Sequence, residues 1–242
     1  MISFILPIRN EFQVIEKTIQ SIISQTIEED FEIIVADGMS TDGTREIIQE
    51  LERENPKIHL IDNPEKIVST GFNRALSISK GDYIIRVDGH SKLEPDFVIN
   101  CLAILTKDVA DCAGGPTEHV ASGLAGESIK MAQSSYFGVG GVLFRKKAKK
   151  GEFVDTLAFG AFKREVFDQL GGYDEELVRN QDDEFNFRLI QNGGKIWLDP
   201  TIKSKYYVRN SLMKLFKQYF QYGFYKVRVM QKRRGVASWR HL

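Results

Sequence analysis

Short apolar runs alternate with stretches of helical periodicity along the first 115 residues of the chain. The runs are rich in isoleucine, valine and phenylalanine, as buried strands are, and span residues 3–8, 31–36, 58–61, 83–87 and 109–113. Between them, apolar residues recur every three or four positions, which predicts helices over residues 14–23, 43–54, 71–79 and 96–105. Strands that alternate with helices form a parallel sheet covered on both faces. The sequence therefore predicts an α/β fold with a doubly wound, mostly parallel sheet.

The pattern is weaker after residue 115. We expect an extended segment over 153–162 and two short helices over 164–170 and 182–191, each ended by a pair of glycines. A short strand over 196–198 and an amphipathic helix over 211–222 follow, and the charged run at 145–151 is typical of a mobile loop. This half of the chain is thus expected to extend the same fold rather than repeat it.

Polar residues follow three of the predicted strands. Parallel sheets bind ligands outside the carboxyl ends of their strands, and the segments at these ends are Pro7–Glu11, Asp37–Gly43 and Asp88–Ser91. Asp88 and His90 combine a carboxylate and an imidazole that can hold one divalent cation, although Asp-Gly is also a common turn. Asp37 can accept hydrogen bonds from a ribose or base, and it can equally serve only the turn before the next helix.

Three consecutive acids mark the start of the helix predicted at 182–191. Acidic side chains in the first turn of a helix interact favourably with the helix dipole. Capping does not require three consecutive acids, however, and here Asp182, Asp183 and Glu184 follow one another. A carboxylate at the edge of a crevice is also a candidate general base for an incoming hydroxyl. Both interpretations are open at this point.

Charge is balanced overall and divided along the chain. The 242 residues carry 33 lysines and arginines and 33 acids, which argues against a uniformly basic nucleic-acid-binding protein, so we expect no nucleic-acid partner. Residues 195–242 hold twelve of the basic residues and a single acid, a net +11, and residues 1–194 therefore carry −11. Such asymmetry suggests that the two regions face different partners.

Cysteines and apolar runs point to an intracellular chain without a membrane span. Cys101 and Cys112 have no metal-ligand spacing and are expected to be buried and reduced. The start, MISFILPIRN, lacks the basic region of a signal peptide, and no window holds about 18 consecutive apolar residues. We expect a cytoplasmic protein that neither crosses a membrane nor is exported.

Five blocks taken together carry a resemblance to a known family. In order they read PIRNE, EIIVADGMSTDGT, GDYIIRVDGH, FGAFKREVFDQLGGYDEEL and QDDEFNFRL. This order resembles the family 2 inverting glycosyltransferases of GT-A fold, over about residues 2–200, and within them the succinoglycan-type enzymes of bacterial exopolysaccharide synthesis. The resemblance implies a nucleotide-sugar-binding half at 1–115, an acceptor-binding half at 116–205 and a basic amphipathic segment at 206–242.

The resemblance also implies roles for individual residues. On the donor side, the residues implied to bind the nucleotide or its diphosphate are Pro7, Ile8, Arg9, Glu11, Asp37, Lys66 and Asp88. Asp88 and His90 would hold the divalent cation, Mn or Mg, with His90 in place of the family's second aspartate. Asp182 would be the catalytic base and Asp183 its neighbouring rival, while Gln181 replaces the usual glutamate. Asp155, Gly160 and Ala161 would line the acceptor side.

The expected activity is transfer of a sugar from a nucleotide sugar, most plausibly a UDP-sugar, to a saccharide or lipid-linked saccharide. The C-terminal segment would bind an anionic membrane surface at the inner face of the cell membrane; the alternative, weighed equally from the residues, is a helix docked on the catalytic domain. Two other functions compete with sugar transfer. One is a nucleotidyltransferase, which would need a glycine-rich phosphate loop that PIRNE lacks, and the other is a scaffold without catalysis.

Overall fold

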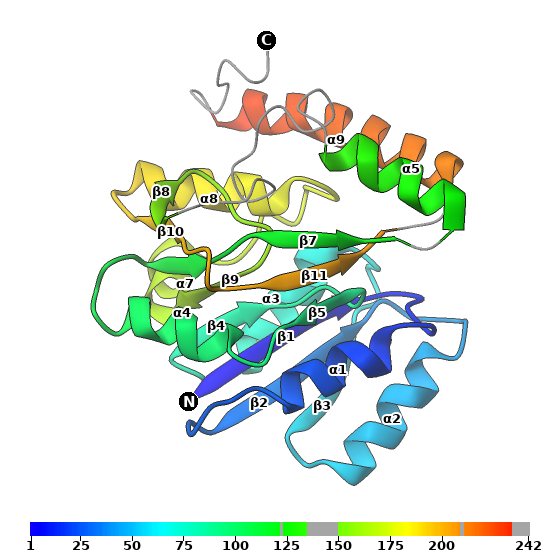
Figure 1. Ribbon diagram of the computed structural model, residues 1–242, viewed down its shortest axis with the longest axis horizontal. Helices are drawn as coiled ribbons and strands as arrows, with labels where there is room; N and C mark the ends of the chain where they lie inside the picture. The colour runs from blue at the N-terminus through cyan, green and yellow to red at the C-terminus, as the bar shows by residue number, and fades with distance from the viewer. Residues whose placement is uncertain (122, 135–149, 209–210, 234–242) are drawn as a thin grey trace.

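The computed structural model describes residues 1–121, 123–134, 150–208 and 211–233 (Figure 1). Its first elements are β1 (Ile2–Ile8), α1 (Ile15–Ile23), β2 (Phe31–Asp37), α2 (Thr44–Glu54), β3 (Ile58–Asp62), α3 (Val68–Ile78), β4 (Tyr83–Arg86), β5 (Ser91–Leu93), α4 (Phe97–Leu105) and β6 (Cys112–Gly114). The later elements are β7 (Thr117–Val120), α5 (Gly123–Ser134), β8 (Glu152–Val154), β9 (Gly160–Lys163), α7 (Arg164–Leu170), α8 (Gln181–Gln191), β10 (Ile196–Leu198), β11 (Ser204–Tyr207) and α9 (Leu212–Lys232).

One eight-stranded sheet organises the described part of the chain. Its order is β3-β2-β1-β4-β9-β6-β10-β8, and β3, β2, β1 and β4 are all parallel. Strand β9 lies antiparallel between β4 and β6, and β8 is antiparallel to β10. The order reverses at β1, which pairs with both β2 and β4, and this is where a doubly wound sheet opens a crevice. The predicted α/β class and mostly parallel sheet are confirmed.

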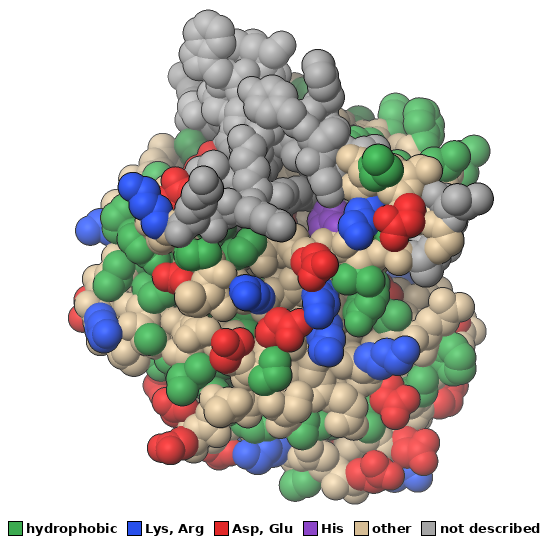
Figure 2. Space-filling view, viewed as in Figure 1, with side chains coloured by type: hydrophobic (Ala, Val, Ile, Leu, Met, Phe, Trp, Pro, Cys, Tyr) green, Lys and Arg blue, Asp and Glu red, His purple; other side chains and the backbone are tan. Residues whose placement is uncertain are grey.

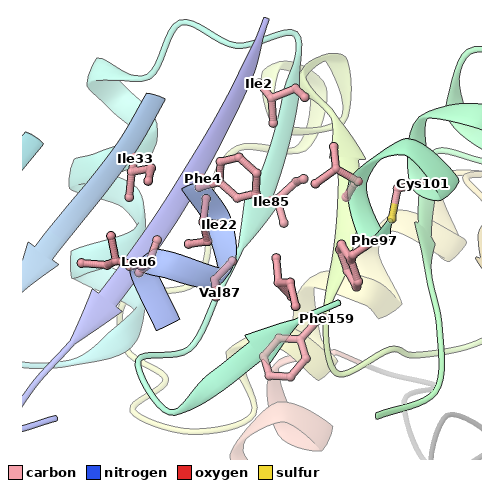
Figure 3. Packing of buried hydrophobic residues seen from close by; sticks show 14 of the residues in the cluster. Ile2, Phe4, Leu6, Ile22, Ile33, Ile85, Val87, Phe97, Cys101 and Phe159 are labelled. Atoms are coloured by element: carbon pink, nitrogen blue, oxygen red, sulfur yellow. The ribbon is translucent and has the colours of Figure 1, made fainter. Parts of the chain in front are cut away.

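Alternate residues of the central strands pack against two helical layers. Phe4 and Leu6 face a cluster completed by α1, α2 and α4, and Figure 3 shows their packing against residues such as Ile22 and Phe97. Ile5 faces the opposite cluster, which α3, α7 and α8 complete. Because strand side chains alternate between faces, a strand with helices on both sides is apolar at every position. This is why the strands read as continuous apolar runs.

The structure differs from the predicted elements in four places. The extended segment expected at 153–162 is split into β8 and β9, which lie at different positions in the sheet. A second, three-stranded sheet of order β5-β11-β7 was not predicted, nor was α5. Strands of three or four residues are too short to show a period, so only their pairing identifies them. Helix α9 also continues ten residues beyond the predicted end at residue 222.

The cysteines are buried as expected, and burial raises the pKa of both thiols, which keeps them protonated. No helix within the described ranges is long and apolar enough to span a bilayer.

The charged run at 145–151 lies almost wholly outside the described residues. On the face shown in Figure 2, acidic and basic side chains lie interspersed below the grey atoms.

Candidate active site

The loops after β1 and β2 are joined by reciprocal hydrogen bonds. Asn10 donates its backbone N–H to Ser40 Oγ at 2.9 Å, and its own Oδ1 accepts the N–H of Thr41 at 2.9 Å. Glu11 donates its N–H to Thr44 Oγ1 at 2.8 Å. Asn10 has a φ of 57°, in the left-handed region that asparagine tolerates better than most residues. The two strand-end segments that the sequence singled out therefore form one rigid unit.

The turn after β4 packs directly on this unit. A Cβ on Gly89 would lie 2.9 Å from Cγ of Glu11 and 2.9 Å from Cγ2 of Ile8, so the approach requires glycine. From the other side, Thr18 of α1 donates its hydroxyl to the carbonyl oxygens of Gly89 and Ser91, at 2.9 and 2.8 Å. The Asp88–Ser91 turn is thus held against the end of β1.

Glu11 orients the imidazole of His90. Nδ1 of His90 lies 2.9 Å from Oε1 of Glu11, and the ring packs edge-on against Tyr206 of β11. Nε2 is buried, and no partner for it exists among the described residues. Because a carboxylate only accepts, Nδ1 supplies the proton of that contact, and in the tautomer this selects Nε2 is the nitrogen with the lone pair. Glu11, predicted to line the nucleotide pocket, contacts the neighbouring histidine.

A largely buried arginine joins the two parts of the site. Nη2 of Arg86, at the end of β4, lies 2.6 Å from Oδ1 of Asp88, and its Nη1 lies 3.6 Å from Oδ2 of Asp182 at the start of α8. Burial alone would raise the pKa of Asp88, but Arg86 and then His90 outweigh it and lower that pKa. Arg86 therefore keeps the predicted metal ligand charged and holds it near the predicted base.

A small pocket opens where these residues meet. Its volume is about 20 Å³, and it is lined by Arg86, Leu157, Ala158, Gly160, Phe162, Tyr173, Asp182 and Asn186. Burial raises the pKa of Tyr173 to about 12, so this hydroxyl stays protonated at neutral pH. Asn186 donates Nδ2 to Thr156 Oγ1 at 3.1 Å, which ties α8 to the segment before β9. The pocket combines one carboxylate, one guanidinium and neutral polar groups.

Asp182 and Asp183 point to different surroundings. Asp182 lines the pocket, whereas Oδ2 of Asp183 accepts a hydrogen bond from Nζ of Lys226, on α9, at 2.5 Å. Asn180 begins α8 with a φ of 61°, and this left-handed residue turns the chain so that the first turn faces the pocket. The third acid, Glu184, is buried and paired with Arg188 and Arg233. Of the three acids, Asp182 is the one available to a ligand in the pocket.

Other predicted site residues differ in how accessible they are. Asp37 is buried, and its carboxylate accepts hydrogen bonds from Ser40 Oγ at 2.6 Å and Arg45 Nη1 at 3.0 Å. This geometry makes Asp37 an organiser of its loop, and direct contact with a nucleotide stays a prediction. Pro7 and Ile8 are buried at the end of β1, whereas Arg9 and Lys66 are exposed.

The acceptor-side prediction needs one correction. Gly160 and Phe162 of β9 line the pocket, but Ala161 between them faces the opposite helical layer and is completely buried. Strand alternation makes this unavoidable, because neighbouring residues point to opposite faces. Asp155 is exposed on the segment between β8 and β9 and does not line the pocket.

Several residues of the site were missed by the sequence reading. They are Arg86, Asn186, Lys226 and Arg233. Arg86 had a signal, because a cation inside the apolar strand YIIRV must find an anionic partner when it is buried. The two cations on α9 had none, since nothing in the sequence shows which acids a later helix will meet.

The fit to a divalent cation rests on two side chains. Asp88 has a second oxygen to which no described residue donates, and His90 presents a buried nitrogen without a partner, oriented by Glu11. A carboxylate behind a ligating histidine is a common arrangement at metal sites. No cluster of three or more His, Cys, Asp or Glu side chains suited to a metal is present in the described ranges. The residues therefore fit an ion whose remaining ligands come from a substrate or water.

Comparison with known proteins decides the family. The model of glycosyl transferase family 2 matches residues 3–171. The chain belongs to this family. The succinoglycan biosynthesis protein ExoA of Rhizobium meliloti (strain 1021) is 32% identical over 240 residues, which are 98% of this chain and 72% of that protein. A dolichyl N-acetyl-alpha-D-glucosaminyl phosphate 3-beta-D-2,3-diacetamido-2,3-dideoxy-beta-D-glucuronosyltransferase of Methanococcus voltae is 30% identical over 242 residues, 96% of this chain and 74% of that protein. The family 2 member described here is a glycosyltransferase.

Solved glycosyltransferase structures share the fold. The mannosyltransferase PcManGT of Pyrobaculum calidifontis, in complex with GDP-Man and Mn²⁺, superposes with a TM-score of 0.72 at 18% identity, covering 96% of this chain and 63% of that one. Residues 1-349 of S. aureus TarS in complex with UDP-GlcNAc give a TM-score of 0.68 at 17% identity, covering 86% of this chain and 58% of that one. The chain thus spans about three-fifths of these solved chains, and the likeness identifies the GT-A fold.

Proposed function

We propose that this family 2 glycosyltransferase transfers a sugar, with inversion, from a nucleotide sugar to a saccharide or lipid-linked saccharide acceptor of a cell-surface polysaccharide. The observation that carries the proposal is that Arg86 contacts both Asp88 and Asp182 and lines one pocket together with Asp182. Relatives that are named for succinoglycan biosynthesis and for a glucuronosyl transfer support the class of reaction. A UDP-sugar is the proposed donor.

In the proposed mechanism Asp182 takes the proton of the acceptor hydroxyl. Inversion needs one base and one group that stabilises the leaving diphosphate, and no covalent intermediate. Asp182 lies at the pocket, and Asp183 is paired with Lys226 instead. We therefore assign the base to Asp182. Asn186, which lines the same pocket, offers an amide for the hydroxyls of the acceptor.

The diphosphate side of the reaction is assigned to the turn after β4. Asp88 and His90 would hold a divalent cation there, Mn²⁺ or Mg²⁺, and a bound cation would neutralise charge that develops on the leaving diphosphate. Glu11 keeps the His90 ring oriented, and Thr18 fixes the turn. Arg9 and Lys66, exposed on neighbouring loops, are the cations proposed to meet the nucleotide.

We also propose that α9 binds an anionic lipid surface on its outer side. Apolar side chains with exposed fractions of 49 to 74% lie there, namely Leu212 and then, at intervals of three or four residues, Met213, Phe216, Phe220, Phe224 and Val227. Hydrophobic side chains gather at the upper right of Figure 2, where Figure 1 places α5 and the first turns of α9. The exposed cations Lys217 and Arg228 flank the row, a combination that suits a membrane interface. An acceptor carried on a lipid would be met at this surface.

Substitution of Asp182 tests the proposed reaction. Asp182→Asn keeps the size of the side chain and removes its basicity, so we expect transfer to fall by roughly 10²- to 10⁴-fold. The donor is first found with a thermal-shift panel of UDP-, GDP- and dTDP-sugars with Mn²⁺, Mg²⁺ or no added metal, since a ligand of the folded state raises the transition. Donor binding should survive the substitution.

Asp183→Asn is the matched variant, one residue along the same helix. We expect it to lose much less activity than Asp182→Asn, because its carboxylate is turned toward Lys226. The opposite order would show that the base is Asp183. No thermal shift with any nucleotide sugar would count against glycosyl transfer and favour the scaffold.

A further inference from the structure

The segment that carries the proposed base is held by the C-terminal helix. Four of the six residues from Arg179 to Glu184 contact α9. Nε of Arg179 donates to Oε1 of Gln221 at 3.2 Å, and Nδ2 of Asn180 donates to the carbonyl oxygen of Tyr222 at 3.0 Å. One turn later Lys226 bonds Asp183, and Nε of Arg233 donates to Oε1 of Glu184 at 2.8 Å. The contacts run in the same order along both segments.

An apolar contact backs this row of polar ones. Val229 of α9 is completely buried against Leu177, with Tyr225 and Phe187 packed around them. The inner side of α9 is therefore docked on the catalytic domain, whereas its outer side bears the exposed apolar row. Asp182 takes no contact from α9 in the described residues; it projects the other way, into the pocket.

We infer that Lys226 is a positioning residue for the base, acting through Asp183, and that Arg233 supports it through Glu184. The inference rests on the proposed function, because it concerns the orientation of Asp182. Three successive acids in one helical turn repel one another; Lys226 neutralises Asp183, and Arg233, directly after α9, adds a second cation to Glu184, which Arg188 also pairs. With Asp183 drawn toward α9 and Glu184 fixed beneath it, the first turn of α8 has one orientation, which directs Asp182 to Arg86.

Arg188 of the same helix also pairs with Glu184, but the cation that pairs with Asp183 comes from beyond the first 194 residues. The partners lie 43 and 49 residues further along the chain, in the region of net charge +11. Basic residues of the region 195–242 therefore pair with acids of the region 1–194 at the start of α8. A glycosyl-transfer site formed only by the loops of residues 1–194 would not need these basic residues.

The experiment compares two lysines of the same helix. Lys226→Met removes the charge and keeps most of the side chain, and we expect kcat to fall roughly 10- to 100-fold with little change in KM for the donor, because a small misplacement of a reacting group has effects of this size. Lys226→Arg should restore most of kcat. Lys232→Met is the matched control: Lys232 pairs with Asp174 and Glu176, outside the base segment, and the variant should keep wild-type kcat.

Hydrogen exchange gives a readout that does not need activity. Amides of the first turn of α8 should exchange faster in Lys226→Met than in the wild type, and Lys232→Met should leave them unchanged. Equal kcat and equal exchange for Lys226→Met and the wild type would overturn the inference. An equal loss of kcat in Lys226→Met and Lys232→Met would also overturn the inference, since it would show that any weakening of the docking of α9 lowers kcat.

The two proposals fail in different ways. If the wild-type protein transfers no sugar from any donor of the panel, the proposed function fails, and the exchange comparison still tests whether Lys226 fixes the first turn of α8. If the wild type transfers sugar and Lys226→Met does so equally well, only the positioning role is lost.

Discussion

The two sides of the site are built differently. On the donor side, the loops after β1 and β2 are joined by hydrogen bonds from backbone N–H groups to neutral side-chain oxygens, and the turn after β4 packs on them through a close approach that only Gly89 allows. On the base side, the start of α8 is held by charged side chains: Arg86 from the sheet and Lys226 and Arg233 from α9. One side depends on local chain geometry and the other on ion pairs between distant segments.

The difference indicates how each side responds to change. A hydrogen bond between neutral groups contributes less to stability than an ion pair with little exposure to water, which is lost with either partner and leaves the other charge poorly solvated. The donor side is therefore expected to lose little when one polar side chain is replaced and to fail when volume is added. The base side should fail when a charge is removed.

The largest effect on stability is expected for Arg86→Met. The substitution leaves Asp88 and Asp182 without their shared cation, and we expect the free energy of unfolding to fall by roughly 2 to 4 kcal/mol, below the top of the range for buried pairs because Asp182 is partly exposed. Urea denaturation measures it. The control is Arg74→Met, whose exposed pair with Glu65 should contribute under about 1 kcal/mol. Equal losses for both arginines would contradict the central place given to Arg86.

A smaller loss is expected for Gly89→Ala, on the donor side. The new methyl group would meet Glu11 and Ile8, and overpacking of this kind costs roughly 1 to 3 kcal/mol. Because the turn carries Asp88 and His90, donor affinity should fall as well, which calorimetric titration would detect. Gly223→Ala is the control: no atom lies within 4 Å of a Cβ there, and α9 should be unchanged or stabilised by up to about 1 kcal/mol. A tolerated Gly89→Ala would show that the two loops are less tightly packed than described.

The smallest effect concerns the pH dependence of the docking of α9. Burial alone would raise the pKa of Asp174, but Lys232 and the N–H of Glu176 outweigh it, so the pKa lies below its usual 3.8. The pair therefore stabilises the fold at pH values above about 4 and loses its contribution as pH falls through the lowered pKa. Asp174→Asn should cost under about 1 kcal/mol at pH 7. The difference from the wild type should vanish near pH 2; a difference that persists there would point to packing instead of charge.

Much of the donor side was predictable from the sequence. The apolar runs identify the strands, and the rule that ligands bind at the carboxyl ends of parallel strands selects the three loops. The resemblance of the motifs then supplied roles for Asp88, His90 and Asp182. Ala161 was assigned wrongly because a motif is read as consecutive letters, whereas a strand presents only every second residue to one face.

The sequence by itself determined the class of fold, the strand-end loops and the division of charge, since these depend on local periodicity and composition. The tertiary structure decided which charges meet. Lys226 and Asp183 are 43 residues apart, and no local pattern fixes a contact between two helices whose relative placement depends on the packing of Val229 on Leu177. The structure therefore gave the basic C-terminal helix two sides: an inner one that holds the start of α8 and an outer one that stays exposed.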